Sequence, residues 1–325
     1  MNLGEVLSGV ALLQPLAPEL AQAPVAALEF DSRRVSPKSL FFAFPGSKAD
    51  GRQFAAEALA HGALAVIGES PAPPDLAGRW IQVAHGRQAL SLAARNFFRR
   101  PDERLFLTGI TGTNGKTTTA YLTDSVLRAA GFTTAMIGTI EYHLAGLVLK
   151  AVNTTPESLD MLRLFAELES AGGTHVTMEV SSHALALGRV YGLNFHTTVF
   201  TNLTRDHLDF HGDMNAYFAA KQLLFDGAGG ARPRYAVLNR EDEWARRIKL
   251  HPQTEVLWYG LGPETDLRPR HIAGGFGGLR FDLQFGKQRF PIESPLIGKI
   301  NVYNILASCA AGLSYGLSPD RKSVV

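Results

Sequence analysis

A run of ten residues near position 110 has the residue types of a phosphate-binding loop. It reads Gly109-Ile-Thr-Gly-Thr-Asn-Gly-Lys-Thr-Thr118, with an apolar run before it and a helical pattern after it. Glycines let backbone N–H groups curl around an anion, and the N-terminus of the following helix adds positive charge. Lys116 would reach the β- and γ-phosphates, and Thr117 would offer its hydroxyl to Mg²⁺. We therefore predict nucleotide binding, although Ile110 stands where the strict G-x-x-x-x-G-K-[ST] pattern has its first glycine.

Two further side chains with metal-binding chemistry follow strand-like runs. Glu179 lies near the end of the run 175–180, and His207 follows the run 197–203. The carboxyl ends of parallel strands meet at one edge of a sheet, which is also the edge where a phosphate loop opens. Each residue alone fits a strand-end cap or a hydrogen-bonded loop residue as well. The shared edge favours metal coordination.

Lys221 is predicted to lie on the apolar side of a helix that Asp213 opens. At 100° per residue it falls among Tyr217, Phe218 and Leu224. Burial disfavours the charged amine and lowers its pKa from about 10.4. A neutral amine can take up carbon dioxide to become a carbamate that binds metals. The residues alone leave open a lysine that reaches solvent from the edge of the helix.

Two other patterns carry weaker signals. Ser181-Ser182-His183 lacks the G-x-S-x-G elbow of a serine hydrolase, and adjacent side chains on an extended segment point apart. Asn239-Arg240-Glu241-Asp242 differs from the guanine-binding N-K-x-D by an arginine, and no D-x-x-G accompanies it. Neither pattern supports its function.

The elements that must position these residues form an α/β pattern. Apolar runs alternate with helical patterns, which predicts a mostly parallel sheet flanked by helices. A helix is expected to begin at Thr155-Pro156, an N-cap and N1 pair. The segment 274–291 is Gly-rich and then alternates, so we expect antiparallel strands appended to the sheet. The predicted strands are 105–111, 134–139, 175–180, 197–203, 235–239 and 255–259.

A chain of 325 residues is long enough for about two domains. We expect a small N-terminal α/β domain over 1–86, a linker helix over 87–103 and a nucleotide-binding domain over 104–325. The boundary is suggested by the polar, Pro-interrupted stretch 99–103.

Composition excludes several classes of protein. The chain has 32 Lys plus Arg against 30 Asp plus Glu, a balance that argues against nucleic-acid binding. Neither a membrane span nor a signal peptide is evident, so we expect no membrane insertion. The one cysteine, Cys309, forms no internal disulfide and fits a cytoplasmic protein.

Seven motifs together carry a resemblance to a known family. They are Gly109–Thr118, Asn153-Thr-Thr-Pro156, Glu179-Val-Ser-Ser-His183, Thr201-Asn-Leu-Thr-Arg-Asp-His-Leu-Asp209, His211-Gly-Asp213, Lys221 and Gly298-Lys-Ile-Asn-Val-Tyr-Asn304. Over almost the whole chain they resemble the Mur ligases. The Glu-Val-Ser-Ser-His string is most similar to the branch that extends UDP-N-acetylmuramoyl-L-alanyl-D-glutamate by one amino acid. The resemblance implies ATP-dependent formation of an acyl phosphate, two Mg²⁺ ions, and attack by the incoming amine.

The resemblance also implies roles for individual residues. The catalytic residues would be Lys116, Glu179, His207 and Lys221. The metal ligands would be Thr117, Glu179, His207 and Lys221 as a carbamate. ATP would be bound by Gly112, Thr113, Asn114, Gly115, Lys116, Thr117 and Thr118, with Asn304 at its adenine end. The uridine-diphosphate region would involve Phe30, Ser32, Ser47, Lys48 and Ala49, and the muramoyl-dipeptide would contact Asn153, Thr154, Thr155, Ser181 and Arg189.

Two features depart from the family pattern. Leu187 stands where a glutamine is common, and the chain ends at Val325, before the family's third domain. We therefore expect a form without the C-terminal domain, which binds its substrates as a monomer but does not complete amide synthesis alone. The added amino acid stays open between meso-diaminopimelate and L-lysine.

Three other functions remain to be weighed. A folylpolyglutamate synthetase shares the phosphate loop but uses a pterin and needs no uridine-binding N-terminal domain. A P-loop NTPase or kinase would turn over nucleotide without a muramoyl peptide. A binding module would bind the same molecules without catalysis.

Overall fold

The computed structural model of the chain describes residues 1–46 and 49–317 and consists of two compact units. The first unit contains residues 1–101, 157–163 and 187–192. The second contains 102–156, 164–186 and the remainder from 193 onward. No helix within the described ranges is long and apolar enough to cross a membrane.

The first unit is built on a four-stranded parallel sheet with the strand order β1-β2-β3-β4. Every residue of β2 is buried, and its neighbour β3 is equally apolar. Phe41 and Val66 of these strands pack against Ala55 and Ala58 of α3. The strands are β1 (Ala27–Glu29), β2 (Ser39–Ala43), β3 (Ala65–Gly68) and β4 (Trp80–Gln82). The helices are α1 (Leu3–Val6), α2 (Pro18–Ala21), η1 (Ser32–Arg34), η2 (Gly51–Phe54), α3 (Ala55–Ala60), η3 (Pro74–Arg79) and α4 (Gly86–Phe97).

The second unit contains an eleven-stranded sheet whose central strands are parallel. The strand order is β15-β14-β13-β12-β11-β10-β5-β9-β6-β7-β8, with antiparallel hairpins at both ends. The strands are β5 (Phe106–Thr111), β6 (Thr134–Ile137), β7 (Glu141–Leu144), β8 (Leu147–Lys150), β9 (His175–Glu179), β10 (Phe195–Phe200), β11 (Tyr235–Asn239), β12 (Glu255–Tyr259), β13 (Leu267–Gly275), β14 (Gly278–Phe285) and β15 (Gln288–Ser294). The predicted parallel sheet and the appended antiparallel strands are both confirmed.

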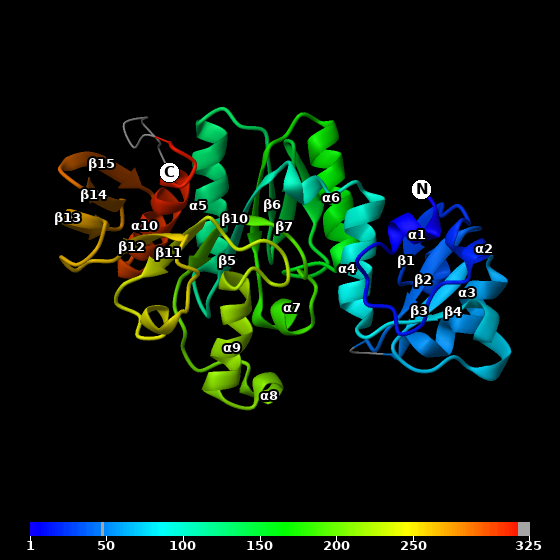
Figure 1. Cartoon of the computed structure of the whole chain (residues 1–325). Helices are drawn as coiled ribbons and strands as arrows, with labels where there is room; N and C mark the ends of the chain where they lie inside the picture. The colour runs from blue at the N-terminus through cyan, green and yellow to red at the C-terminus, as the bar shows by residue number, and fades with distance from the viewer. Residues whose placement is uncertain (47–48, 318–325) are drawn as a thin grey trace. The chain divides into compact units, whose positions relative to one another are not determined.

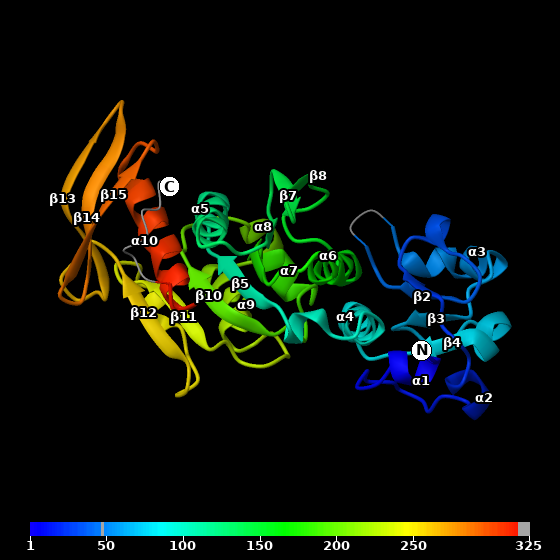
Figure 2. The same cartoon turned by 90° about the horizontal axis from the view of Figure 1, so that it is seen from above.

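Helices cover both faces of this sheet (Figures 1 and 2). Side chains alternate along a strand, so neighbouring residues of β5 face different helices. Ile110 packs in the core with α5 (Lys116–Ala129) and α10 (Lys299–Leu313). A Cβ on Gly109 would instead meet Leu224 of α9 (Met214–Phe225) at 3.2 Å. The remaining helices are α6 (Ser158–Ser170), α7 (Ser182–Ala186), α8 (Leu208–His211) and the 3-10 turns η4 (Pro101–Glu103) and η5 (Ala245–Arg247).

The predicted start of α6 at Thr155 is wrong, because the helix begins at Ser158. The hydroxyl of Thr155 donates to the carbonyl oxygen of Glu179 at 2.9 Å and accepts from the N–H of Ser181 at 3.1 Å. These bonds use the capping oxygen to hold the end of β9. The Thr155-Pro156 pair therefore precedes the helix and does not form its N-cap and first residue.

Candidate functional site

The phosphate-binding loop joins β5 to α5, the context that its sequence predicted (Figure 1). Gly112 and Gly115 have φ values of 146° and 84°, which favour glycine. A Cβ on Gly112 would lie 1.9 Å from Thr201 Oγ1, and one on Gly115 would lie 2.5 Å from Asn304 Oδ1. Both glycines are required by backbone conformation and by close approach of a neighbouring side chain.

Lys116 is the first residue of α5, and its side chain folds over the loop. Its Nζ donates to the carbonyl oxygens of Gly112 at 3.1 Å and Thr113 at 2.9 Å. Burial lowers the pKa of Lys116 below its ordinary value, partly offset by Glu179 and Asp206. The amine is thereby held at the helix N-terminus, where an anionic phosphate group is favoured. Thr118 lies in the same first turn.

Hydrogen bonds to the residues that follow β10 hold the backbone of Asn114 in place. Its N–H donates to Asn202 Oδ1 at 3.0 Å, and its carbonyl oxygen accepts from Thr201 Oγ1 at 2.7 Å and Asn202 Nδ2 at 3.0 Å. Thr113 Oγ1 donates to the carbonyl oxygen of Thr204 at 3.2 Å. The shape of the loop thus depends on the neighbouring strand. Asn202 was part of a family-like motif but received no role from the sequence.

Glu179 lies fully buried at the end of β9, next to the loop. Its Oε2 accepts from Thr117 Oγ1 at 3.0 Å, and its Oε1 accepts from the N–H of Thr139 at 2.8 Å. Gly138 makes room for this carboxylate, since a Cβ there would lie 2.7 Å from Oε1. The structure therefore brings Glu179 to the loop, and it adds Thr139, which the sequence did not single out.

Lys221 is buried on α9, as its helical position predicted. Its Nζ donates to the carbonyl oxygen of Gly112 at 2.9 Å, the same oxygen that Lys116 contacts. The amine lies 4.5 Å from the centre of the Tyr217 ring. Burial holds the pKa of Lys221 well below its ordinary value, and the nearby Lys116 charge adds to this effect. Such an amine is neutral more readily than an exposed lysine.

His207 precedes α8 with a φ of 52°, and its side chain is half exposed. Its ring lies 4.9 Å from the His183 ring and 6.0 Å from the Tyr217 ring. Tyr217 therefore lies near both His207 and Lys221. Hydrogen bonds connect Glu179 to Thr117 and Thr139, and none connects it to His207.

The residues present suit a Mg²⁺ ion that arrives with nucleotide. Among the described side chains, no group of three or more His, Cys, Asp or Glu could hold a metal. Thr117 and Glu179 nevertheless bring a hydroxyl and a carboxylate oxygen together. Mg²⁺ prefers oxygen ligands and usually combines one or two carboxylates with water and substrate phosphates. The donor set fits that arrangement and not an all-protein cage.

Asn304 lies on α10, and its side chain approaches the phosphate loop at Gly115. Its Nδ2 donates to Asn301 Oδ1 at 2.9 Å, and its Oδ1 accepts from Thr119 Oγ1 at 3.4 Å. The same Oδ1 is the atom nearest to Gly115. The structure places Asn304 against the phosphate loop, while its role at adenine stays a prediction.

The second-unit residues assigned to the muramoyl-dipeptide gather around the end of β9. Thr154 Oγ1 lies 3.1 Å from Thr139 Oγ1, which itself contacts Glu179. Ser181 Oγ accepts from the N–H of Ala184 at 3.1 Å and so caps α7. The Tyr142 hydroxyl donates to the carbonyl oxygen of Asn153 and accepts from its N–H. The Thr155 hydroxyl bonds the backbone of Glu179 and Ser181.

The residues assigned to uridine diphosphate belong to the first unit. Phe30 stacks on Phe44 with ring centres 6.2 Å apart. Ser32 Oγ donates to Glu57 Oε2 at 3.1 Å. The carbonyl oxygen of Ala49 accepts from the N–H of Gly46 at 2.9 Å. Ser47 and Lys48 lie outside the described residues.

Two curated proteins similar to this chain share one name. UDP-N-acetylmuramoyl-L-alanyl-D-glutamate--2,6-diaminopimelate ligase of Solibacter usitatus (strain Ellin6076) is 78% identical over 320 residues, 98% of this chain and 65% of the relative. The protein of the same name from Geobacillus kaustophilus (strain HTA426) is 43% identical over 298 residues, 90% of this chain and 60% of the relative. The chain thus spans less than two thirds of the length of these relatives.

Solved structures also match this chain over most of its length. A structure of UDP-N-acetylmuramoyl-L-alanyl-D-glutamate--2,6-diaminopimelate ligase matches with a TM-score of 0.86 and 27% identity, over 99% of this chain and 65% of that one. Folylpolyglutamate synthase of Mycobacterium tuberculosis matches with a TM-score of 0.56 and 17% identity, over 72% of this chain and 61% of that one. The second likeness concerns the fold alone.

Two family models match successive stretches of the chain. The model described as "Mur ligase family, catalytic domain" matches residues 24–98. The model described as "Mur ligase middle domain" matches residues 110–312, more than half of the chain. The first match falls in the unit with the Phe30–Phe44 pair, and the second contains residues 110–118 of the phosphate loop. The chain therefore belongs to the Mur ligase family.

Proposed function

We propose that the chain carries the nucleotide and substrate sites of a MurE-type ligase, which adds an amino acid to UDP-N-acetylmuramoyl-L-alanyl-D-glutamate. The observation that carries this proposal is the meeting of Lys116 and Lys221 at the Gly112 carbonyl oxygen, beside the buried Glu179. The names of the relatives favour 2,6-diaminopimelate over L-lysine as the amino acid.

The first step needs positioning and charge neutralisation more than an acid or a base. A carboxylate oxygen of the substrate attacks the γ-phosphorus of ATP, the bond to the β,γ-bridging oxygen breaks, and ADP leaves. Lys116 and the N-terminus of α5 stabilise the charge that spreads over the transferred group. Mg²⁺, for which Thr117 and Glu179 are the proposed ligands, supplies further neutralisation when it is bound.

The second step forms the amide. The deprotonated amine of the amino acid attacks the acyl carbon, the carbon–oxygen bond to phosphate breaks, and inorganic phosphate leaves. The proposed dipeptide contacts Thr154, Thr155 and Ser181 lie at the end of β9, so they would hold the acyl group close to the loop. Orientation by such contacts lowers the entropy cost of the attack.

Lys221 is proposed to act as a carbamate. Its amine is buried, its pKa is lowered by that burial, and it lies at the loop. Uptake of carbon dioxide would exchange a buried amine for a carboxylate-like group able to bind metal. We expect a ¹³C carbamate resonance after equilibration with ¹³C-bicarbonate, absent from Lys221→Gln. Equal spectra for the two proteins would remove this part of the proposal.

Calorimetric titration tests the substrate assignment. We expect UDP-N-acetylmuramoyl-L-alanyl-D-glutamate to bind more tightly than UDP alone, because the muramoyl-dipeptide adds its own contacts. Affinity no greater than that of UDP would contradict the assignment. A P-loop NTPase or kinase would instead hydrolyse ATP at a rate that the muramoyl-dipeptide leaves unchanged.

ATP and the nucleotide-linked substrate are intracellular molecules, so we propose that the protein is cytoplasmic. The resemblance to the Mur ligases is the ground on which we propose a monomer.

A further inference from the structure

The connection 138–140 between β6 and β7 carries the residue that holds both oxygens of Glu179. The N–H of Thr139 donates to Glu179 Oε1 at 2.8 Å, and its hydroxyl donates to Oε2 at 3.2 Å. The same Oε2 accepts from Thr117 Oγ1 at 3.0 Å. Glu179 is therefore held from two sides, by Thr139 of the connection and by Thr117 of α5.

Metal binding would change the contact on the Thr117 side. Mg²⁺ binds oxygen ligands at about 2.1 Å in octahedral geometry, which places neighbouring ligand atoms about 3 Å apart. Thr117 Oγ1 and Glu179 Oε2 are 3.0 Å apart, so their spacing already suits such a pair. When both oxygens turn their lone pairs to a metal, the hydrogen bond between them is weakened. The position of Glu179 then depends on Thr139 and on the connection that carries it.

A second contact ties this connection to α5. Tyr121 lies one turn beyond Thr117 on α5, so both side chains lie on one face of the helix. The Tyr121 hydroxyl donates to Glu141 Oε1 at 2.8 Å. Glu141 is the first residue of β7 and follows Thr139 by two residues. The helix and the connection are thus joined at two successive points, and only the first would involve the metal.

The Glu141 carboxylate is also held by His143 of β7. A carboxylate only accepts hydrogen bonds, so His143 Nε2 donates to Glu141 Oε1, at 2.9 Å. His143 Nδ1 lies 3.6 Å from Oδ2 of the buried Asp124 on α5. The hydrogen bonds from His143 and Tyr121 lower the pKa of Glu141, which keeps it an ionised acceptor. Burial and then the Glu141 bond raise the pKa of Tyr121 to about 12, so its hydroxyl keeps the proton.

We propose that Tyr121 and Glu141 are positioning residues for Glu179, because they hold the connection 138–140 against α5 when Mg²⁺ and nucleotide occupy the loop. They act through Thr139. Outer contacts of this kind orient a metal ligand, and their loss commonly weakens metal binding about 10- to 100-fold. The inference rests on the proposed Mg²⁺–nucleotide site and on none of the residues assigned to the muramoyl-dipeptide.

The test separates nucleotide binding from metal binding. ATP is titrated into the wild-type chain and its variants in EDTA and again in excess Mg²⁺, and the gain in ATP affinity caused by Mg²⁺ is compared. We expect Tyr121→Phe and Glu141→Ala each to reduce this gain about fivefold or more. Their ATP affinities in EDTA should stay within about twofold of wild type, because the loop itself keeps its contacts.

Two further variants test the contact itself. Glu141→Gln keeps an amide oxygen that can accept from Tyr121, so it should recover part of the gain that Glu141→Ala loses. Combining Tyr121→Phe with Glu141→Ala should reduce the gain no further than either change alone, because both remove the same contact.

Tyr315→Phe is the matched control. It removes a tyrosine hydroxyl that lies 2.6 Å from Thr108 Oγ1 in the first half of β5, whereas the phosphate loop follows the end of that strand. Its gain from Mg²⁺ should equal that of wild type. Thermal unfolding of each variant, measured beforehand, ensures that the titrations use folded protein.

Three results would contradict the inference. Wild-type gains in both Tyr121→Phe and Glu141→Ala would overturn it and leave the proposed nucleotide site intact. Equal weakening of ATP binding in EDTA and in Mg²⁺ would also overturn it, since the contact would then only support the shape of the loop. A wild-type chain whose ATP affinity does not respond to Mg²⁺ would overturn the proposed metal site together with the inference.

Discussion

Lys221 illustrates how far a single residue can be interpreted from its sequence position. Helical periodicity placed it on the side of aromatic and aliphatic neighbours but left open a side chain that reaches solvent, and the structure shows that Lys221 is buried. Its contact with the Gly112 carbonyl oxygen could not be predicted, because α9 follows the loop by about a hundred residues and meets it only through the sheet. Asn202 was missed for the same reason: its role depends on β10 lying beside β5.

Replacing Lys221 by methionine should stabilise the fold. Because burial lowers the pKa of Lys221, the unfolded chain binds a proton more readily than the folded chain, and this costs stability at neutral pH. We expect Lys221→Met to raise the free energy of unfolding by about 1–3 kcal/mol at pH 7 in carbonate-free buffer. Urea titration measures this, with the exposed Lys249→Met as control. An unchanged or lowered value for Lys221→Met would contradict it.

Gly112 should tolerate no side chain. Gly112→Ala would place a Cβ 1.9 Å from Thr201 Oγ1 at a φ of 146°, so either the loop or β10 must shift. We expect a loss of about 2 kcal/mol or more in stability and weaker ATP binding. Gly78→Ala is the control, because no atom lies within 4 Å of its Cβ position. ATP affinity equal to wild type in Gly112→Ala would show that the loop does not need this close approach.

At the scale of elements, strand length decided what could be predicted. The runs 235–239 and 255–259 match β11 and β12 at both ends, because each contains four consecutive apolar or aromatic residues with polar or turn residues beside them. The first unit was predicted only as a small α/β domain. Its strands β1 and β4 have three residues each, too few for any periodicity to identify them.

Aromatic and histidine side chains form a cluster at the amino-terminal ends of the central strands β5, β9 and β10. His175 of β9 and His196 of β10 both contact Tyr315, and their rings also lie near Phe106. Burial is the main cause that lowers the pKa of both histidines from 6.5 to about 4. Each histidine is therefore neutral in the folded protein at pH values where it would be protonated in the unfolded chain.

This cluster predicts an acid-sensitive sheet. As the pH falls from about 6.5 towards 4, the unfolded chain takes up protons that the folded chain does not, so stability decreases over that range. We expect the double variant His175→Gln and His196→Gln to lose much of this pH dependence, even if its stability at pH 7 is lower. Urea midpoints between pH 7 and pH 4.5 measure the slope. Parallel curves for wild type and variant would refute the cluster as its source.

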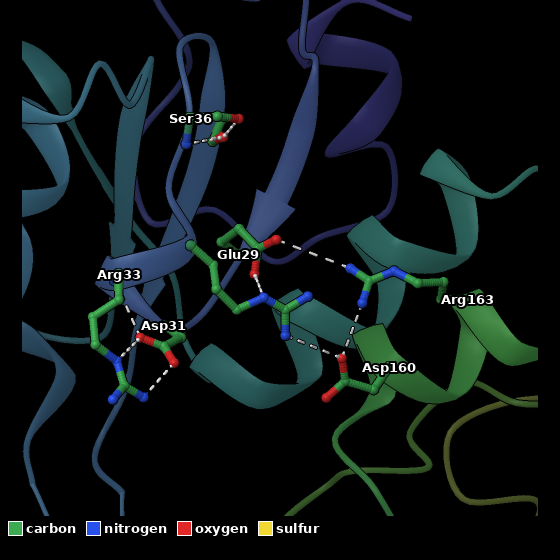
Figure 3. Close-up of polar contacts among 8 residues, drawn as sticks. Glu29, Asp31, Arg33, Ser36, Asp160 and Arg163 are labelled. Carbon is green, nitrogen blue, oxygen red and sulfur yellow. Dashed lines mark hydrogen bonds and ion pairs between the residues drawn. The ribbon is translucent and has the colours of Figure 1, made fainter. Parts of the chain in front are cut away.

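For the whole molecule, the order of the two domains along the chain was predicted from the sequence. Which segments of the chain belong to each unit was not. The segments 157–163 and 187–192 join the first unit although more than fifty residues separate them from residue 101. Ion pairs link the segment 157–163 to this unit: Glu29 of β1 lies 4.0 Å from Arg163, and Arg34 lies 3.8 Å from Asp160 (Figure 3). Pairing between distant charged residues leaves no periodic signal in a sequence.

The 325-residue chain should bind without efficient catalysis. The proposed binding residues concern ATP and the muramoyl-dipeptide, and no residue is proposed for the amino acid. We expect the chain to bind both substrates and to form only traces of the tripeptide product. Chromatography of a reaction with ATP, Mg²⁺, UDP-N-acetylmuramoyl-dipeptide and 2,6-diaminopimelate measures this. Sustained turnover would show that these residues already contain the amino-acid site.

The interleaving of the two units has a consequence for dissection and recombination. The backbone passes between the units after residues 101, 156, 163, 186 and 192, so no cut at one place separates them. A fragment ending at residue 101 would expose Glu29 and Arg87 without Arg163, Glu157 or their neighbours. The N-terminal unit therefore cannot be exchanged between homologous enzymes as a cassette with one junction. A working chimaera must take the start of α6 and the segment 187–192 from the same parent.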